Sequence, residues 1–228
     1  LGNLILMGKD KLKRFSELNT FTHVLQPLLN EIKPAHKIKG NWNFEFKNEA
    51  PIVLELGCGK GEYTVGLAKQ YPSINFIGVD IKGARIWRGA KTCVEEKIEN
   101  VRFIRTKVDF IEHFFRQNEV SEIWLTFSDP QPKRPRKRLT SPLFIDRYKK
   151  ILTKNGIIHL KTDSDLLYNY TLDEIKENNY TLLESSKDVY QELLSRADAK
   201  LKQLMSSEKL QEDYDAFISK ANASRDAK

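Results

Sequence analysis

The sequence predicts an α/β fold, with a doubly wound, mostly parallel sheet of about seven strands and helices on both faces. Short apolar runs alternate with helical patterns along residues 52–183, which is typical of parallel strands joined by crossover helices. A glycine-rich turn, Gly57–Gly61, follows the first apolar run and precedes a helical pattern. Turns at the carboxyl ends of such strands are where open α/β sheets bind ligands.

Composition predicts a globular protein with a polyanionic partner. The 228 residues are 40% hydrophobic and 30% charged, with a net charge of +7 and a pI near 9.2. The length suits one sizeable domain, and the basic excess favours a nucleic acid or another polyanion. We expect a basic N-terminal extension at residues 1–40, then a single domain at 41–228 with a charged, helical C-terminal tail.

Several classes of protein are disfavoured. No apolar run approaches the roughly 20 residues of a membrane span, and the apolar start Leu1–Leu6 is too short for a secretory signal. Cys58 and Cys93 lie far apart, and the four histidines show no metal-ligand spacing. The sequence therefore predicts a cytoplasmic protein without a membrane segment or a metal.

The predicted elements begin within the extension. Apolar residues at helical spacing predict a short helix packed on the domain; they are Phe15, Leu18, Phe21, Val24 and Leu25. Trp42, Phe44 and Phe46 alternate with polar residues, which predicts an extended edge segment anchored in the core.

The domain itself is predicted as alternating strands and helices. Strands are expected at 52–56, 74–80, 101–106, 122–127, 157–160 and 180–183, with a weaker seventh signal at 217–223. Helices are expected from 62 to about 71, at 83–99, at 110–117, from 142 to about 152, and from 165 to about 177. Ser141-Pro142 predicts a helix start, Asn155-Gly156 the end of that helix, and Ser164 the cap of the next.

Four acidic residues lie at or near strand ends, namely Glu55, Asp80, Asp109 and Asp129. The G-x-G-x-G turn lets the backbone at Gly57 and Gly59 approach a ligand, but its spacing is not that of a dinucleotide site. Glu55 would repel a pyrophosphate, so a cationic ligand with an amino-acid end fits better. Asp80 ends the second predicted strand, near the position where an acid binds a ribose diol, and Asp109 follows the third, from which it could reach an adenine amino group. The alternative is that these acids are ordinary helix caps.

A proline-rich basic loop follows Asp129. Pro130, Pro132 and Pro135 exclude a regular helix or a central strand, and the run Lys133–Arg138 holds five bases. Cations on a stiffened loop suit phosphate groups. A solvated surface loop is the alternative for a basic run alone.

Three motifs together resemble the tRNA (guanine-N7)-methyltransferases over roughly residues 50–185. They are Glu55–Gly61 (Glu-Leu-Gly-Cys-Gly-Lys-Gly), Ser128–Lys133 (Ser-Asp-Pro-Gln-Pro-Lys) with its basic continuation to Thr140, and Lys161-Thr162-Asp163. The glycine turn indicates only a class I methyltransferase with a Rossmann-like fold. The second and third motifs are more specific. The chain departs from the family at Gln131, where an aromatic residue is usual.

The resemblance implies S-adenosylmethionine as cofactor, tRNA as substrate and partner, and a methyltransferase domain at 41–228. By resemblance the cofactor contacts are Glu55, Asp80, Asp109 and Asp129, beside Gly57 and Gly59. The expected substrate contacts are Lys133, Arg134, Arg136, Lys137, Arg138 and Asp163. A C-terminal Thr-x-Tyr-Glu substrate motif of the family is matched only by Glu212-Asp213-Tyr214-Asp215, so Glu212 and Asp215 are further candidates.

The expected chemistry is methylation at guanine N7, by resemblance in the variable loop of tRNA. This nitrogen has a free lone pair at neutral pH and needs no base, so catalysis reduces largely to positioning. Asp129 is the predicted catalytic residue, lining the cofactor pocket and accepting from the Watson–Crick edge of the base. Tyr63, Trp87 and Trp124 are interpreted as packing residues. Cys58 is not expected to act as a nucleophile, because N-methylation needs no covalent intermediate.

Other functions remain open at this point. They are a class I methyltransferase acting on another RNA position or on a small molecule, and a noncatalytic RNA-binding protein with this fold. A nicotinamide dehydrogenase is the weakest alternative, because the glycine spacing and Glu55 disagree with it. The chain is expected to be a monomer or a homodimer.

Overall fold

The computed structural model describes residues 11–188 and residue 192. The chain divides into two compact units, Leu1–Asn179 and Tyr180–Lys228. The first unit contains a six-stranded sheet in the order β1-β4-β3-β2-β5-β6, and every neighbouring pair is parallel. The doubly wound α/β prediction is therefore confirmed, with six strands in the described part of the chain.

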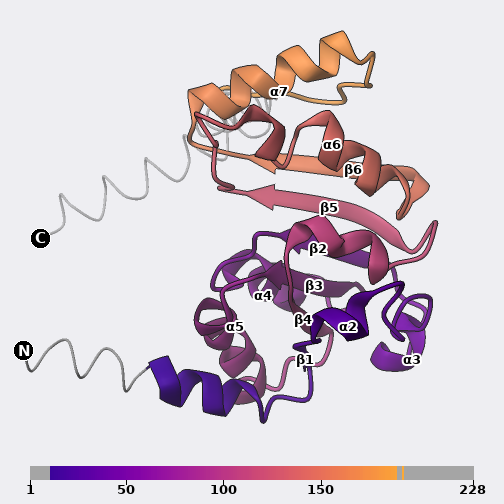
Figure 1. Ribbon diagram of the computed structural model, residues 1–228, viewed down its shortest axis with the longest axis vertical. Helices are drawn as coiled ribbons and strands as arrows, with labels where there is room; N and C mark the ends of the chain where they lie inside the picture. Colours follow the sequence, from indigo (N-terminus) through magenta and orange to yellow (C-terminus); the bar gives the residue numbers. More distant parts are fainter. Residues whose placement is uncertain (1–10, 189–191, 193–228) are drawn as a thin grey trace, which may run out of the picture. The chain divides into compact units, whose positions relative to one another are not determined.

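The strands run side by side across Figure 1. Their bounds are β1 Val24–Leu25, β2 Ile52–Leu56, β3 Asn75–Asp80, β4 Val101–Arg105, β5 Val120–Thr126 and β6 Leu152–Lys161. The α-helices are α2 Leu29–Ile32, α3 Trp42–Phe46, α4 Glu62–Gln70, α5 Gly83–Glu95, α6 Pro142–Lys149 and α7 Asp165–Glu177. Two 3₁₀ helices are η1 Val108–His113 and η2 Pro135–Lys137, and residues 11–18 form a further helix ahead of β1.

The strand order reverses between β2 and β5. From β2 the chain builds outward through β3 to β4, then returns to place β5 on the other side of β2 and β6 beyond it. In open α/β sheets the crevice at such a reversal, at the carboxyl ends of the strands, is the ligand site. The topology therefore indicates a ligand site just beyond Leu56 and Thr126, where β2 and β5 end.

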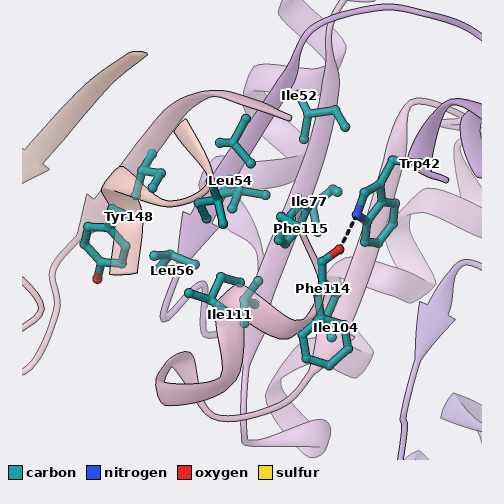
Figure 2. Close-up of a cluster of buried hydrophobic side chains, with 14 of the residues drawn as sticks. Trp42, Ile52, Leu54, Leu56, Ile77, Ile104, Ile111, Phe114, Phe115 and Tyr148 are labelled. Atoms are coloured by element: carbon teal, nitrogen blue, oxygen red, sulfur yellow. Dashed lines mark hydrogen bonds between the residues drawn. The ribbon is translucent and has the colours of Figure 1, made fainter. Parts of the chain in front are cut away.

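Alternate residues of the strands supply two cores, one on each face of the sheet. Leu54 and Leu56 belong to one cluster, which α3, η1 and α6 cover, whereas Val53 belongs to the other, under α4 and α5. Figure 2 shows the first cluster, in which Trp42 Nε1 donates to the Phe114 carbonyl at 3.0 Å. All five residues of β2 are buried, as expected of a central parallel strand.

Two predicted elements near the N-terminus are wrong. Val24–Leu25 is an edge strand, not part of a helix, because it pairs with Phe103 and Ile104 of β4. The segment Trp42–Phe46 is a helix rather than an extended edge. Trp42 and Phe46, four residues apart, face the core together, and Phe44 points to solvent.

The later part of the chain contains three further differences. Asn155-Gly156 does not end a helix but lies inside β6, at an irregularity in its pairing with β5. Tyr180–Leu183 forms no strand. The weak strand signal at 217–223 lies outside the described residues.

The helix at residues 11–18 packs beside α5 (Figure 1). Trp87 Nε1 donates to Glu17 Oε2 at 2.8 Å, and Lys91 Nζ lies 2.9 Å from Glu17 Oε1. Leu18 is buried in the cluster under α4 and α5. The residues before β1 therefore contribute to the core that supports the sheet.

Candidate active site

The glycine turn after β2 forms an open cradle. Both the Gly57 and Cys58 amides donate to the Val79 carbonyl, at 2.8 and 3.0 Å, which ties the turn to β3. Gly59 has φ +58°, and a Cβ built there would meet nothing within 4 Å. Its backbone therefore faces open space at the sheet edge, where a ligand can approach closely.

Glu55 is buried and connects three elements. Its Oε2 accepts from the backbone amide of Thr64 in α4 at 2.8 Å and from the Thr64 hydroxyl, and its Oε1 accepts from the hydroxyl of Thr126 in β5. Burial raises the pKa of Glu55, opposed by these hydrogen bonds. The carboxylate thus holds α4 and β5 against β2 directly beneath the turn.

Asp80 lies against the turn from the end of β3. Its Oδ2 accepts from the Gly59 amide at 3.0 Å, and its Oδ1 accepts from the Lys82 amide at 2.7 Å. Each carboxylate oxygen has two acceptor positions. Asp80 therefore keeps acceptor capacity for hydroxyl groups beside the glycine backbone.

Asp129 is exposed three residues beyond the end of β5. Its Oδ1 accepts from the Gln131 amide at 2.9 Å. The residues two places before and after it, Phe127 and Gln131, have positive φ values of 48° and 44°. Two left-handed residues thus bracket Asp129 and turn the chain sharply at the strand end.

The basic loop is anchored at its far end. Arg138 is buried; its Nε donates to the Pro130 carbonyl at 2.8 Å, and its guanidinium lies 4.2 Å from the centre of the Tyr170 ring. Lys137 Nζ lies 3.2 Å from Asp109 Oδ1. Lys133, Arg134 and Arg136 are exposed. The structure thus separates one internal arginine from the outward-facing bases.

The remaining predicted residues fall in two places. Asp163 is exposed two residues after the end of β6, whose Lys161 carbonyl accepts from the Phe127 amide at 2.8 Å. Asp163 and Asp129 therefore follow neighbouring strands at the same edge. Glu212 and Asp215 lie outside the described residues.

Sequence reasoning missed part of this edge. Thr64 and Thr126, the partners of Glu55, carry no motif of their own, and the exposed ring of Phe127 gave no signal in an apolar run. The buried hydroxyls of Thr106 and Ser128, at the ends of β4 and β5, have no hydrogen-bond partner among the described residues. A polar ligand at this edge would supply one.

The edge fits S-adenosylmethionine. The open backbone at Gly59, the acceptor oxygens of Asp80 and the unpaired hydroxyls of Thr106 and Ser128 suit a ligand with a ribose and an amino-acid end. Cys58 is buried and its thiol pKa lies well above the ordinary value, mainly through burial, so it is no thiolate nucleophile.

Two other kinds of site receive no support in the part of the chain that the structure describes. No group of three or more His, Cys, Asp or Glu residues in it could hold a metal ion. No helix in it has the length and apolar character to cross a membrane.

Comparisons with known proteins agree with this geometry. Residues 49–213 match the family model Methyltransf_4, described as "Putative methyltransferase". The tRNA (guanine-N(7)-)-methyltransferase of Christiangramia forsetii is 53% identical over 188 residues, covering 80% of this chain and 84% of that protein. Its namesake from Bacteroides fragilis is 51% identical over 186 residues, covering 81% and 74%.

A solved structure shows a more distant likeness. The aminoglycoside resistance methyltransferase NpmB1 is 14% identical and covers 64% of this chain and 70% of its own, with a TM-score of 0.46. A likeness at this level carries no argument on function.

The sheet order, the glycine turn and the strand-end acids define a class I S-adenosylmethionine-dependent methyltransferase. With the relatives above, the chain belongs to the tRNA (guanine-N7)-methyltransferase family.

Proposed function

We infer that this chain transfers a methyl group from S-adenosylmethionine to N7 of a guanine in tRNA. The observation that carries this conclusion is the identity of about half of the residues with curated enzymes of that name over four fifths of the chain. The open glycine turn, which Asp80 contacts, lies at the strand-order reversal and supports it independently.

The reaction requires little acid–base catalysis from the protein. When bound, S-adenosylmethionine would supply a methyl group on a sulfonium. A bond from the lone pair of guanine N7 to that methyl would form as the methyl–sulfur bond breaks, with the neutral thioether as leaving group, so no residue has to remove a proton first. The protein's part is to hold base and methyl in line and to exclude water. This agrees with a site that contains carboxylates and hydroxyls but no histidine or thiolate at the strand ends.

The cofactor side is assigned to the turn and two acids. We propose that Asp80 accepts from the ribose hydroxyls, beside the open backbone of Gly57 and Gly59. We propose that Asp109, in η1 after β4, accepts from the adenine amino group. Glu55 acts from below: its oxygens are engaged by Thr64 and Thr126, so it fixes the turn and orients any cofactor contact through it.

The guanine side is assigned to Asp129 and Asp163. Both are exposed and follow β5 and β6, which are neighbours in the sheet. Carboxylates accept from the N1–H and N2–H₂ donors of the guanine Watson–Crick edge. Because a folded tRNA hides its bases, the target guanine leaves its stack to reach them.

The tRNA backbone is assigned to the outward-facing bases of the loop. Lys133, Arg134, Arg136 and Lys137 are exposed there, and cations on such a loop position phosphates. Arg138 serves the same surface indirectly, because it is buried and shapes the loop. Glu212 and Asp215 remain proposed substrate contacts.

The wider setting follows from the substrate. We propose a cytoplasmic enzyme, since tRNA is its partner and Cys58 and Cys93 are both free. We further propose a monomer or homodimer without a metal, whose methyltransferase domain spans 41–228 and whose target lies in the variable loop.

A labelling experiment tests the function. The purified chain is incubated with methyl-labelled S-adenosylmethionine and unmodified bulk tRNA, and the RNA is digested to nucleosides. The expected label is in 7-methylguanosine. Label in another nucleoside would keep the methyltransferase and overturn the target atom. Absence of both label and cofactor binding would favour a noncatalytic RNA-binding protein.

A further inference from the structure

Phe127 is held in an unusual conformation just beyond the carboxyl end of β5. It follows directly after β5, its side chain is 51% exposed, and its φ is +48°. A positive φ is unfavourable for a bulky residue, and a half-exposed ring gains less from burial than a core ring does. The amide of Phe127 nevertheless donates to the Lys161 carbonyl at 2.8 Å, which fixes the conformation against β6.

A second aromatic ring meets Phe127 from another element. Tyr63, in the first turn of α4, has its ring centre 6.2 Å from that of Phe127, with the planes inclined by 56°. Lys161 Nζ lies 5.2 Å from the centre of the Tyr63 ring and 5.8 Å from that of Phe127. Tyr63 and Phe127, which we call the aromatic corner, therefore come together from two segments at the edge of the sheet. The Lys161 ammonium, from a third segment, already lies against both rings.

This corner lies where a base has to be presented. Phe127 is two residues from Asp129, and its hydrogen-bond partner Lys161 is two residues from Asp163. From Phe127 to Arg138 no other residue of the loop is aromatic. Any stacking surface that the loop offers to a purine between the two acids is therefore the Phe127 ring.

We propose that Phe127, supported by Tyr63, is the surface on which the target guanine stacks for methylation. This proposal rests on the function proposed above and deepens it. Base stacking on an aromatic ring contributes appreciably to nucleic-acid binding. N7 methylation also moves positive charge from the sulfonium onto the purine, and aromatic faces attract cations. The contact is therefore stronger in the transition state than with the neutral base, and so favours reaction as well as binding.

The alternative role for these rings is to form a wall of the cofactor pocket, because Tyr63 lies only two residues after Gly61 of the glycine turn. The two roles differ in what a variant changes. A guanine-stacking ring affects reaction with tRNA and leaves cofactor affinity alone. A cofactor wall affects the dissociation constant for S-adenosylmethionine at least as strongly.

The test compares Phe127→Leu, which keeps an apolar side chain but removes the ring, with Phe127→Tyr, which keeps the ring. Phe44→Leu is the matched control, because Phe44 is 74% exposed and lies on α3, whose Glu45 bonds Arg102 near the amino end of β4. Each variant is measured for the cofactor dissociation constant by calorimetry, for kcat and KM with tRNA, and for melting temperature.

We expect Phe127→Leu to lower kcat/KM for tRNA roughly 10- to 100-fold, the range of one base stacked on a ring. Its cofactor dissociation constant should stay within about twofold. Phe127→Tyr should keep most of the activity and Phe44→Leu all of it. Wild-type kcat/KM for Phe127→Leu, or a loss matched by weaker cofactor binding, would overturn the proposal.

A second variant guards against a folding defect. If Phe127→Leu lowers the melting temperature strongly, Tyr63→Leu replaces it, with a smaller loss of kcat/KM expected and cofactor affinity again unchanged. A Tyr63→Leu variant with the wild-type kcat/KM for tRNA would then contradict the proposed stacking role. Failure of the wild-type chain to form 7-methylguanosine in the same assay would refute the function itself, and is thereby distinguished from failure of the stacking role.

Discussion

Lys137 Nζ lies 3.2 Å from Asp109 Oδ1, joining the basic loop to the acid that follows β4. The two residues have different proposed tasks, since Lys137 is assigned to tRNA phosphate and Asp109 to the cofactor. Their side chains are 53% and 34% exposed, so the pair contributes little to folding. The pair joins the proposed tRNA site to the proposed cofactor site.

Lys137→Ala separates these tasks. We expect a change in the free energy of unfolding below about 1 kcal/mol, and cofactor binding at least as tight as before, because Asp109 loses a competing partner. Affinity for tRNA should fall, and the slope of log affinity against log salt should shrink by about 0.7–0.9, the value for one phosphate contact. Lys154→Ala, an exposed lysine near the start of β6, is the control. Equal slopes for the two variants would contradict the assignment.

Arg138 should behave unlike its neighbours in the loop. Arg138→Ala removes a buried side chain that bonds the Pro130 carbonyl and stacks on Tyr170, so we expect a loss of about 2–4 kcal/mol in unfolding free energy. Arg136→Ala, at an exposed position, should leave stability unchanged and only weaken tRNA binding. Denaturant unfolding of both variants measures this. A stable Arg138→Ala with a purely RNA-binding defect would refute the internal role.

Glu55 predicts a pH dependence of stability. Its pKa is raised in the folded chain, mainly by burial, so the folded state binds a proton more readily than the unfolded state. Its contribution is therefore fully present below the unfolded value of about 4.3 and is lost as pH rises through the folded pKa. The free energy of unfolding of wild type minus that of Glu55→Gln should fall over this window. A difference that is flat or rises with pH would contradict it.

The partners of Glu55 give a second test of the same residue. The glutamine oxygen can still accept from Thr64, and its NH₂ group can donate to the Thr126 hydroxyl oxygen, so Glu55→Gln should change stability little near pH 7. Glu55→Ala leaves the Thr64 amide and two hydroxyls unpaired, at about 1–3 kcal/mol for each buried group. We expect the free energy of unfolding, measured in urea, to fall by at least about 3 kcal/mol. Equal stability of the alanine and glutamine variants would refute the connecting role.

The helix at residues 11–18 offers a matched pair of leucines. Leu18 is 1% exposed in the core under α4 and α5, whereas Leu12 is 72% exposed. Leu18→Ala should cost about 2–5 kcal/mol and Leu12→Ala less than about 0.5 kcal/mol. Chemical denaturation compares the two. A small effect at Leu18 would mean that this helix does not share the core of the sheet.

Much of the sheet was predictable from sequence because its central strands are buried on both faces. Ile52–Leu56 is a continuous apolar run and appears as β2 with the predicted bounds. Ser164 was predicted as a helix cap, and its side chain accepts from the Leu167 amide at the start of α7. In both cases the local sequence carries the whole signal.

The failures arise where tertiary contacts decide. Val24–Leu25 is only two residues long and becomes a strand because the edge of β4 is available to it. Trp42–Phe46 reads as alternating over five residues, a length at which periods of 2 and 3.6 are hard to separate. At the site, the strand-end acids were visible, but the burial of Arg138 and the left-handed conformation of Phe127 depend on neighbours remote in sequence.

We propose that methyl transfer takes place at the carboxyl end of β5, with Asp129 holding the guanine. The most direct measurement is the single-turnover rate of tRNA methylation by Asp129→Ala, with cofactor saturating and its binding and melting temperature measured separately. We expect a folded variant whose rate falls at least about 100-fold, the usual scale for losing a key positioning group. A folded, cofactor-bound Asp129→Ala that methylates tRNA at the wild-type rate would contradict it.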